Sequence, residues 1–236
     1  MARSDRLPPL RVGLIALFVT ALVTSQVTAS KLLAFQSPVA LPVTGETLIL
    51  PGAALAYAVT FFASDCYAEL YGRRAAQVMV NVAFAMNFVL LVLVWSTIAA
   101  PVAANSAVDA ATFRSVLGAS TSVVVGSLVA YLVSQNWDVI VFHRIRERTG
   151  AGRLWLRNLG STASSQAIDT VIFVTLAFRF VPAALGNSQG VLPWSVVASL
   201  IVGQYALKLL IALVDTPVVY AVVGYARSGV SVPSPF

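Results

Sequence analysis

Six long stretches of apolar and almost uncharged residues restrict this chain more than any other feature of its sequence. They lie near residues 12–35, 52–71, 75–99, 116–142, 162–180 and 192–223. A helix needs about 20 mostly apolar residues to cross the hydrocarbon layer of a membrane, because each residue adds only about 1.5 Å of length. The sequence therefore predicts an all-α membrane protein with six transmembrane helices in one domain, residues 1–227, followed by a loose tail at 228–236.

The composition excludes the main alternatives to a membrane protein. Only 10% of the 236 residues are charged, 58% are hydrophobic, and the mean hydropathy is +0.86. So few charges could not cover the surface of a soluble domain of this size, and the apolar content is too high for a disordered chain. The continuous apolar run at 78–93 also lacks the alternation that is typical of a membrane β-strand.

The arginines fall on alternate connections between the predicted helices. Those on one side are Arg3, Arg6, Arg11, Arg73, Arg74, Arg144, Arg146, Arg148, Arg153, Arg157 and Arg227. The other side holds only Arg114, together with Arg179 at a helix end. Because positively charged connections stay in the cytoplasm, this pattern predicts that both termini are cytoplasmic. The net charge of +6 is thus explained by orientation in a lipid bilayer, and we expect no nucleic-acid partner.

Seven ionisable residues fall inside the predicted helices, where a charge is costly and therefore indicates a function. They are Lys31, Asp65, Glu69, Asp138, Asp169, Lys208 and Asp215. Lys31 and Lys208 can each form an internal ion pair with an acid, and Glu69 can pair with Arg73 one turn further on. Acids still remain in excess, so we expect a water-lined central cavity in which an acid such as Asp65 exchanges a proton during transport.

A polar motif occurs twice, in the predicted fourth and fifth helices. Both copies have the pattern Ser-Gln-x-x-Asp-x-x-x-Phe, at 134–142 and 165–173. In each copy the Gln, Asp and Phe share one helical face. These residues are Gln135, Asp138, Phe142, Gln166, Asp169 and Phe173. Amides and carboxylates can bind the edge of a planar heterocycle, and aromatic rings can stack on its faces. The alternative is that the polar groups bond the helices to one another.

The two halves of the chain share a weaker similarity. The run at 22–26 resembles the run at 131–135, and both end in Ser-Gln. Three helices in each half would give the halves opposite orientations, so this similarity predicts an inverted 3+3 repeat, which is common in transporters.

The polar segments taken together resemble a known family. The most distinctive is Ser161-Thr162-x-x-Ser165-Gln166-x-x-Asp169-Thr170-x-x-Phe173. The others are Ala29-Ser30-Lys31, residues 52–57, Asp65-x-x-x-Glu69-x-Tyr71-Gly72-Arg73-Arg74, residues 127–142, Trp155-x-Arg157-Asn158, Lys208 and Asp215. In these segments the chain resembles the YhhQ-type queuosine precursor transporters, also called the vitamin uptake transporter family.

This resemblance implies an importer of 7-deazaguanine bases, the 7-cyano or 7-aminomethyl precursors of queuosine, in a bacterial-type inner membrane. The protein would be a secondary carrier without a cofactor, working alone or as a homodimer, and not an enzyme. We expect substrate binding by Asp169, Gln166, Gln135, Asp138, Asp65, Glu69, Asn158, Phe61, Phe142 and Phe173, with Lys31, Lys208 and Asp215 in ion pairs or coupling. The alternative is a substrate-binding membrane subunit of an energy-coupling ABC importer, which would need ATPase partners.

The sequence also argues independently against an enzyme or a metal site. It contains a single histidine, His143, beside Arg144 at a predicted helix end, and a single cysteine, Cys66. No histidine pair, nucleophile elbow or glycine-rich phosphate loop is present in the sequence.

The predicted orientation can be tested by labelling single cysteines in intact cells. In a Cys66→Ala background, Ser106→Cys should react with a membrane-impermeant maleimide from outside, because it lies on the connection that is poor in arginine. Gly152→Cys should react only after the cells are permeabilised. The reverse pattern would contradict six helices with cytoplasmic termini.

Overall fold

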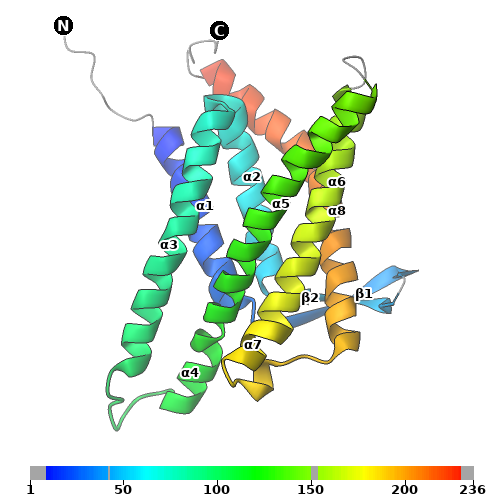
Figure 1. The fold of residues 1–236 in the computed structure, drawn as a ribbon. Coiled ribbons are helices and arrows are strands. Elements are labelled where there is room, and N and C mark those ends of the chain that lie inside the picture. The colour runs from blue at the N-terminus through cyan, green and yellow to red at the C-terminus, as the bar shows by residue number, and fades with distance from the viewer. Residues whose placement is uncertain (1–8, 42, 150–153, 230–236) are drawn as a thin grey trace, which may run out of the picture.

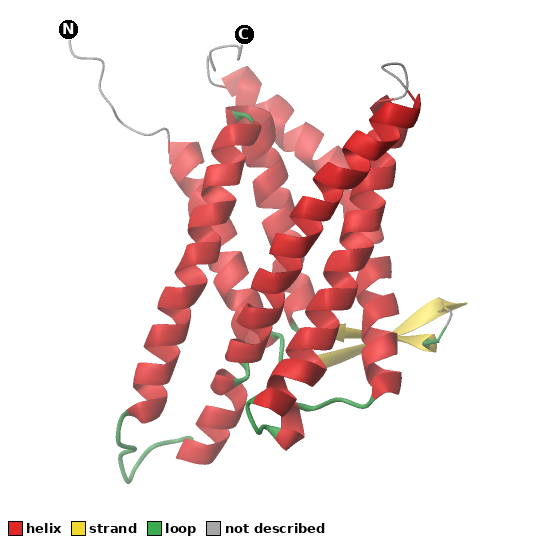
Figure 2. Ribbon diagram, viewed as in Figure 1, coloured by secondary structure: helices red, strands yellow, loops and turns green. Residues whose placement is uncertain are grey.

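The computed structural model is a bundle of six long helices (Figures 1 and 2). It describes residues 9–41, 43–149 and 154–229. The long helices are α1 (Pro9–Thr28), α2 (Ala53–Tyr71), α3 (Arg73–Ala99), α5 (Ser120–Thr149), α6 (Leu154–Thr175) and α8 (Trp194–Gly229). The shorter elements are β1 (Leu32–Leu41), β2 (Gly45–Pro51), α4 (Ala110–Gly118), a π-helix (Leu176–Phe180), α7 (Val181–Ala184) and a 3₁₀ helix (Ser188–Gly190).

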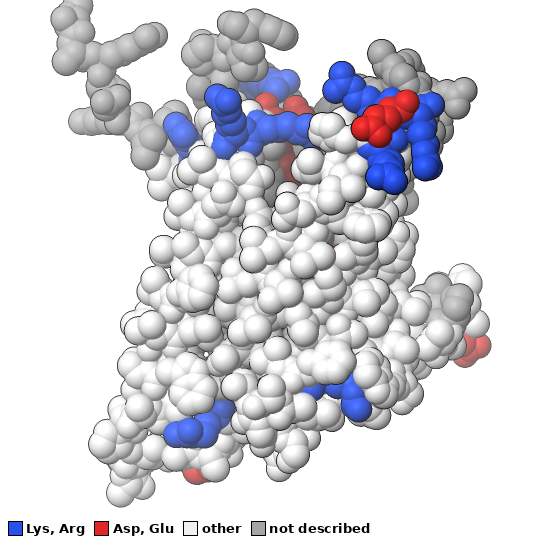
Figure 3. All heavy atoms as spheres, viewed as in Figure 1, with Lys and Arg blue, Asp and Glu red and all other residues white. Residues whose placement is uncertain are grey.

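The bundle has the dimensions and surface of a membrane protein. Within the described residues, five helical segments are long and apolar enough to cross a membrane, namely Pro9–Thr28, Arg73–Ala99, Ala110–Arg148, Gly160–Ala184 and Trp194–Arg227. The sixth long helix, α2, carries Asp65 and Glu69 and runs alongside the others (Figure 1). Figure 3 shows a broad uncharged belt, with basic side chains gathered mainly at one end of the bundle. The prediction of a mainly α-helical, multi-pass membrane protein is thus confirmed.

The start of α1 and the end of α8 lie at the same end of the bundle as the start of α3 and the end of α5 (Figure 1). Arg73 and Arg74 begin α3, and Arg146 and Arg148 lie in the last turn of α5. This arrangement agrees with the alternation of arginines along the sequence. The cytoplasmic location of this end and the inverted repeat stay predictions. Of the predicted tail at 228–236, residues 228 and 229 end α8, and residues 230–236 lie outside the described residues.

The first helix is shorter than the sequence predicts. It ends at Thr28 rather than near residue 35, and the chain then enters an antiparallel hairpin in which Leu33 pairs with Leu50 and Phe35 with Leu48. Gly45 has a φ of 62°, the left-handed conformation that a tight turn needs and that glycine adopts without strain. The apolar residues of β1 thus join an apolar partner strand instead of extending the helix.

Lys31 is displaced by this hairpin, and its predicted position inside a membrane helix is wrong. It lies in the bend between α1 and β1 and is exposed. Its backbone carbonyl accepts a hydrogen bond from the Gly52 amide at 2.6 Å, but its side chain forms no ion pair with any described residue.

The connection between α3 and α5 contains the short helix α4. Asp109 caps this helix, because its Oδ1 atom accepts hydrogen bonds from the Ala111 and Thr112 amides, both at 2.9 Å. The Thr112 hydroxyl also donates to Oδ2 of Asp109 at 2.6 Å. This hydroxyl bond, followed by the bonds from the amides, lowers the pKa of the Asp109 carboxyl.

Two apolar clusters form the interior. One joins α1, α2, α3 and the end of α8 and includes Phe18, Leu22 and Tyr67. The other joins α5, α6, the π-helix and the start of α8 and includes Phe173 and Leu200. The buried interior is therefore divided into two parts rather than forming one continuous core.

Glycine allows the hairpin to rest directly on α8. A Cβ atom at Gly203 would lie only 2.4 Å from the Ile49 backbone carbonyl oxygen of β2. Gly224 lies in the same helix with no atom within 4 Å of the corresponding position. The two glycines therefore differ in packing although both are helical.

We predict opposite effects on stability for alanine at these two glycines. Gly203→Ala should lower the free energy of unfolding by about 1–3 kcal/mol, because the hairpin backbone must move away from α8. Gly224→Ala should leave it unchanged or raise it by about 0.5–1 kcal/mol, since alanine is the better helix former. Thermal unfolding of the detergent-purified variants measures both, and equal effects would mean that the close contact at Gly203 is unimportant.

Candidate functional site

A cavity of about 230 Å³ lies inside the bundle, bordered by residues of both apolar clusters. Side chains from α1, α2, α3, α5, α6 and α8 line it. Its charged residues are Asp169 and Lys208, and its amide side chains are Gln26, Gln135, Gln166 and Gln204. Its aromatic residues are Phe18, Tyr57, Phe61, Phe84, Tyr131 and Phe173. The lining thus combines an ion pair, amides and aromatic rings within a mostly apolar protein.

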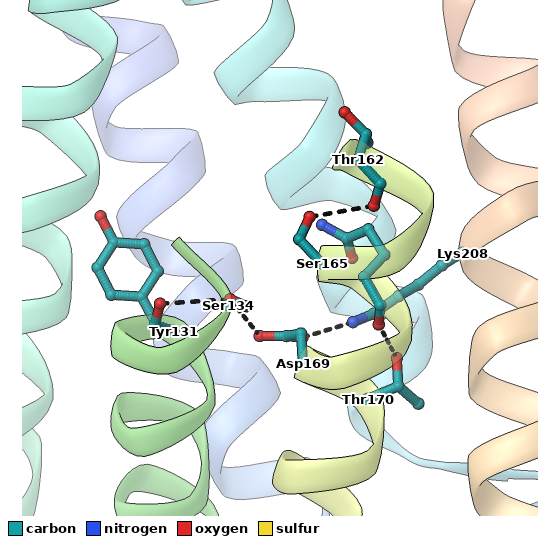
Figure 4. A network of polar contacts seen from close by, with 8 residues as sticks. Tyr131, Ser134, Thr162, Ser165, Asp169, Thr170 and Lys208 are labelled. Carbon is teal, nitrogen blue, oxygen red and sulfur yellow. Dashed lines mark hydrogen bonds and ion pairs between the residues drawn. The ribbon is translucent and has the colours of Figure 1, made fainter. Parts of the chain in front are cut away.

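The two charges of the cavity neutralise each other. Lys208 Nζ donates to Asp169 Oδ2 at 2.6 Å, and the side chains are only 5% and 17% exposed. Figure 4 shows Asp169 on α6 between Lys208 on one side and Ser134 on the other, whose hydroxyl donates to Oδ1 at 3.3 Å. Lys208 Nζ also lies 5.9 Å from the centre of the Tyr57 ring. The pair joins α6 to α8 and leaves the cavity with no formal net charge.

The repeated motif links α5 and α6 reciprocally. Ser134 of the first copy donates to Asp169 of the second, and Ser165 of the second copy donates to Oδ1 of Asp138 in the first, also at 3.3 Å. Each serine thus bonds the aspartate of the other copy across two neighbouring helices. Asp169 of the second copy lines the cavity, whereas Asp138 of the first copy does not.

The glutamine side chains of the cavity lack hydrogen-bond partners within the part of the chain that the structure describes. None of the four side-chain amides forms a hydrogen bond with another described residue. Three of them directly follow a serine, at 25–26, 134–135 and 165–166. Each of these serines lies within hydrogen-bond distance of the backbone carbonyl three residues before it. The serine hydroxyls are therefore used within the protein, whereas the amides remain available.

Aromatic rings form two pairs on the cavity wall. Tyr57 and Phe61 of α2 meet edge to face with ring centres 5.2 Å apart. Phe84 of α3 and Tyr131 of α5 stack with ring centres 4.5 Å apart and an angle of 21° between the planes. The Tyr131 hydroxyl accepts a hydrogen bond from Gln77 at 2.6 Å, which fixes the position of the stacked pair. Such rings offer flat surfaces to a flat ligand.

Six of the predicted residues line the cavity. They are Gln135, Gln166, Asp169, Phe61, Phe173 and Lys208. Five other predicted residues, Asp138, Asp65, Glu69, Phe142 and Asp215, lie outside the lining. The side chain of Asn158 lies outside the described residues.

Two of these acids, Asp65 and Asp215, lie on the neighbouring helices α2 and α8. On α2, Tyr57, Phe61 and Ser64 line the cavity, and Asp65 follows Ser64 by about 100° of helix rotation. Asp215 lies on α8, which continues as a helix past Pro217. Phe61 lines the cavity and Asp65 does not, and a role of Asp65 in binding or coupling stays a prediction.

Glu69 lies near the end of α2, where its side chain is 59% exposed. Its Oε2 atom is 3.8 Å from Nη2 of Arg227, which also donates to the Glu69 backbone carbonyl at 2.9 Å. The predicted partner Arg73 is thus replaced by Arg227, because the end of α8 packs beside α2. This position removes Glu69 from the cavity.

Six amide and aromatic residues of the lining are not among the predicted site residues, namely Gln26, Gln204, Phe18, Tyr57, Phe84 and Tyr131. Gln26 and Gln204 carried a signal, since Gln26 repeats the Ser-Gln pair and Gln204 lies one turn before Lys208. Tyr57 and Tyr131 lie in segments that resemble the family, but Phe18 and Phe84 carried no signal, because aromatic residues also occur on the lipid-facing sides of membrane helices.

Comparison with known proteins assigns the family. A family model described as "Putative vitamin uptake transporter" matches residues 51–222. The chain belongs to the vitamin uptake transporter family. It is 33% identical over 166 residues to a protein of Bacillus subtilis (strain 168) named "Probable queuosine precursor transporter", an alignment that covers 70% of this chain and 68% of that protein. No solved structure matches the chain. The chain is accordingly a membrane transporter and not an enzyme, and its polar cavity is the candidate substrate site.

The ion pair of this transporter should be structural as well as part of the cavity. Lys208→Met should lower the free energy of unfolding by about 3–5 kcal/mol, because the buried carboxylate of Asp169 loses its partner. The double variant Lys208→Met/Asp169→Asn should recover most of this loss, and thermal unfolding in detergent measures both.

The exposed pair of Arg227 and Glu69 provides the control. Arg227→Met should cost less than about 1 kcal/mol, since water screens a pair at the surface. Equal losses for Lys208→Met and Arg227→Met would show that the cavity pair does not hold the helices together.

Proposed function

We propose that this protein imports 7-deazaguanine precursors of queuosine, the 7-cyano base, the 7-aminomethyl base or both, across the bacterial inner membrane. The name of the Bacillus subtilis relative and the family of the chain support this substrate class. In this proposal both termini are cytoplasmic, and the base binds in the central cavity, which opens alternately to the two sides of the membrane.

The observation that carries the proposal is the set of unpartnered amides around a neutralised ion pair. A carboxamide offers both a donor and an acceptor in one plane, as the edge of a nucleobase does. Gln135 and Gln166 lie in the cavity with their amides free of other described residues. The absence of a net charge in the cavity suits a base better than a strongly charged solute.

Asp169 has capacity for a ligand in addition to its internal partners. A carboxylate oxygen can accept two hydrogen bonds, and the Asp169 oxygens each have one partner among the described residues, Lys208 at Oδ2 and Ser134 at Oδ1. The ring N–H and the exocyclic amine of a guanine-like base lie side by side and can donate to such a group. Phe61 and Phe173 supply ring surfaces on the same cavity, beside which the base can stack.

Uptake by living cells tests the proposal. Cells that cannot synthesise 7-deazaguanines and lack their own importer should accumulate labelled 7-cyano-7-deazaguanine only when they express this protein. Deleting the ATPases of energy-coupling importers from the same cells should leave the uptake unchanged. The absence of uptake from a well-expressed protein would contradict the proposal.

Purified variants test the role of Asp169 by titration with the 7-cyano base. Asp169→Asn should weaken binding by about 1.5–3 kcal/mol, the range for a hydrogen bond to a charged group. Asp138→Asn is the matched control, because it changes the same position of the other motif copy outside the cavity, and its affinity should equal that of the wild type. Wild-type affinity in a monodisperse Asp169→Asn protein would exclude Asp169 from base recognition.

A further inference from the structure

Two of the four cavity glutamines are almost completely buried. Gln26 of α1 is 2% exposed and Gln204 of α8 is 8% exposed. The Oε1 atom of each is enclosed and has no hydrogen-bond partner. A buried carbonyl without a donor costs about 1–3 kcal/mol relative to a satisfied one. These two side chains therefore reduce the stability of the ligand-free protein.

The surrounding polar groups are engaged elsewhere. Ser25, next to Gln26, donates to the Leu22 carbonyl at 2.7 Å. Tyr205, next to Gln204, donates to the Ala163 carbonyl at 3.3 Å. Lys208, one turn after Gln204, donates to Asp169. The neighbouring donors thus leave both glutamine oxygens unsatisfied.

Asn87 shows that burial alone does not indicate a ligand. Its side chain is 0% exposed, and both its Oδ1 and Nδ2 atoms lack partners, but it does not line the cavity. Gln26 and Gln204 differ from Asn87 because they line the cavity, as Gln166 and Asp169 also do. Unsatisfied acceptors next to that space point to donors that arrive with a ligand.

We infer that Gln26 and Gln204 are substrate-binding residues whose side-chain carbonyl oxygens accept hydrogen bonds from N–H groups of the cargo. The identity of the cargo rests on the proposed function, whereas the binding role rests on burial and on the absence of partners. Two acceptors on different helices require a ligand with at least two N–H donors. A 7-deazaguanine meets this requirement, since it has N–H groups on its pyrimidine edge and another on its pyrrole ring.

The two unsatisfied amides also affect the stability of the unloaded protein. An apolar side chain of similar shape at either position would remove the unsatisfied amide while filling the same volume. The variant should therefore be at least as stable as the wild type without substrate and should bind substrate less well. A residue that only supports the fold would show the opposite behaviour, because its replacement would lower stability.

The experiment uses Gln26→Met, Gln204→Met and the control Asn87→Leu in the full-length protein. Thermal unfolding without ligand gives the stability of each, and titration with 7-cyano-7-deazaguanine gives the affinity. All three variants should unfold at or above the wild-type temperature. Only the two glutamine variants should lose affinity, each by about tenfold, which corresponds to one hydrogen bond.

Two results would overturn the inference. One is a lower unfolding temperature for both glutamine variants than for Asn87→Leu, which would make the amides structural. The other is wild-type affinity in both glutamine variants. If the wild-type protein binds neither the 7-cyano nor the 7-aminomethyl base, the proposed function is wrong, and the stability of the ligand-free variants still decides whether the two amides belong to the fold.

Discussion

The interior of this protein depends on the ion pair between Lys208 and Asp169. Two opposite charges in a mostly apolar bundle are tolerated only because they lie in direct contact, at 2.6 Å. The pair joins α6 to α8, and α8 in turn contacts α2 and the hairpin through β2. One electrostatic contact thus links two helices of the cavity wall and also keeps the cavity formally neutral.

The remaining polar groups follow from the same constraint. In the absence of water, a polar group on a membrane helix must bond to its own backbone, to a neighbouring helix or to a ligand. Serines 25, 134 and 165 each lie within hydrogen-bond distance of a backbone carbonyl of their own helix. Serines 134 and 165 also bond the aspartates of the repeated motif on the neighbouring helix. The glutamine side chains beside them form no hydrogen bond with another described residue, which supports the proposal that they bind the ligand.

The division of the interior into two apolar clusters leaves a cavity for the polar side chains. Close packing of one continuous core would have left no room for a solute. Phe18 and Leu22 of one cluster and Phe173 of the other border the cavity instead. The rings of Tyr57, Phe61, Phe84 and Tyr131 complete the wall, so that a flat ligand meets aromatic surfaces as well as amides.

The sequence by itself determined the long helices, the alternation of arginines and the concentration of polar residues in the two motif copies. Membrane thickness and the cost of burying charge act on composition, so these properties can be predicted without knowing which helices lie next to each other.

Tertiary structure alone decided which of the polar residues in each motif line the cavity. Asp138 and Asp169 occupy the same motif position, yet only Asp169 meets a lysine, because α8 passes beside α6. Lys31 lies outside the membrane helix because a partner strand forms at 45–51, and on α2 Phe61 and Ser64 line the cavity whereas Asp65 does not. The partner of each polar residue depends on which helix lies opposite, and the spacing of residues along one helix does not contain that information.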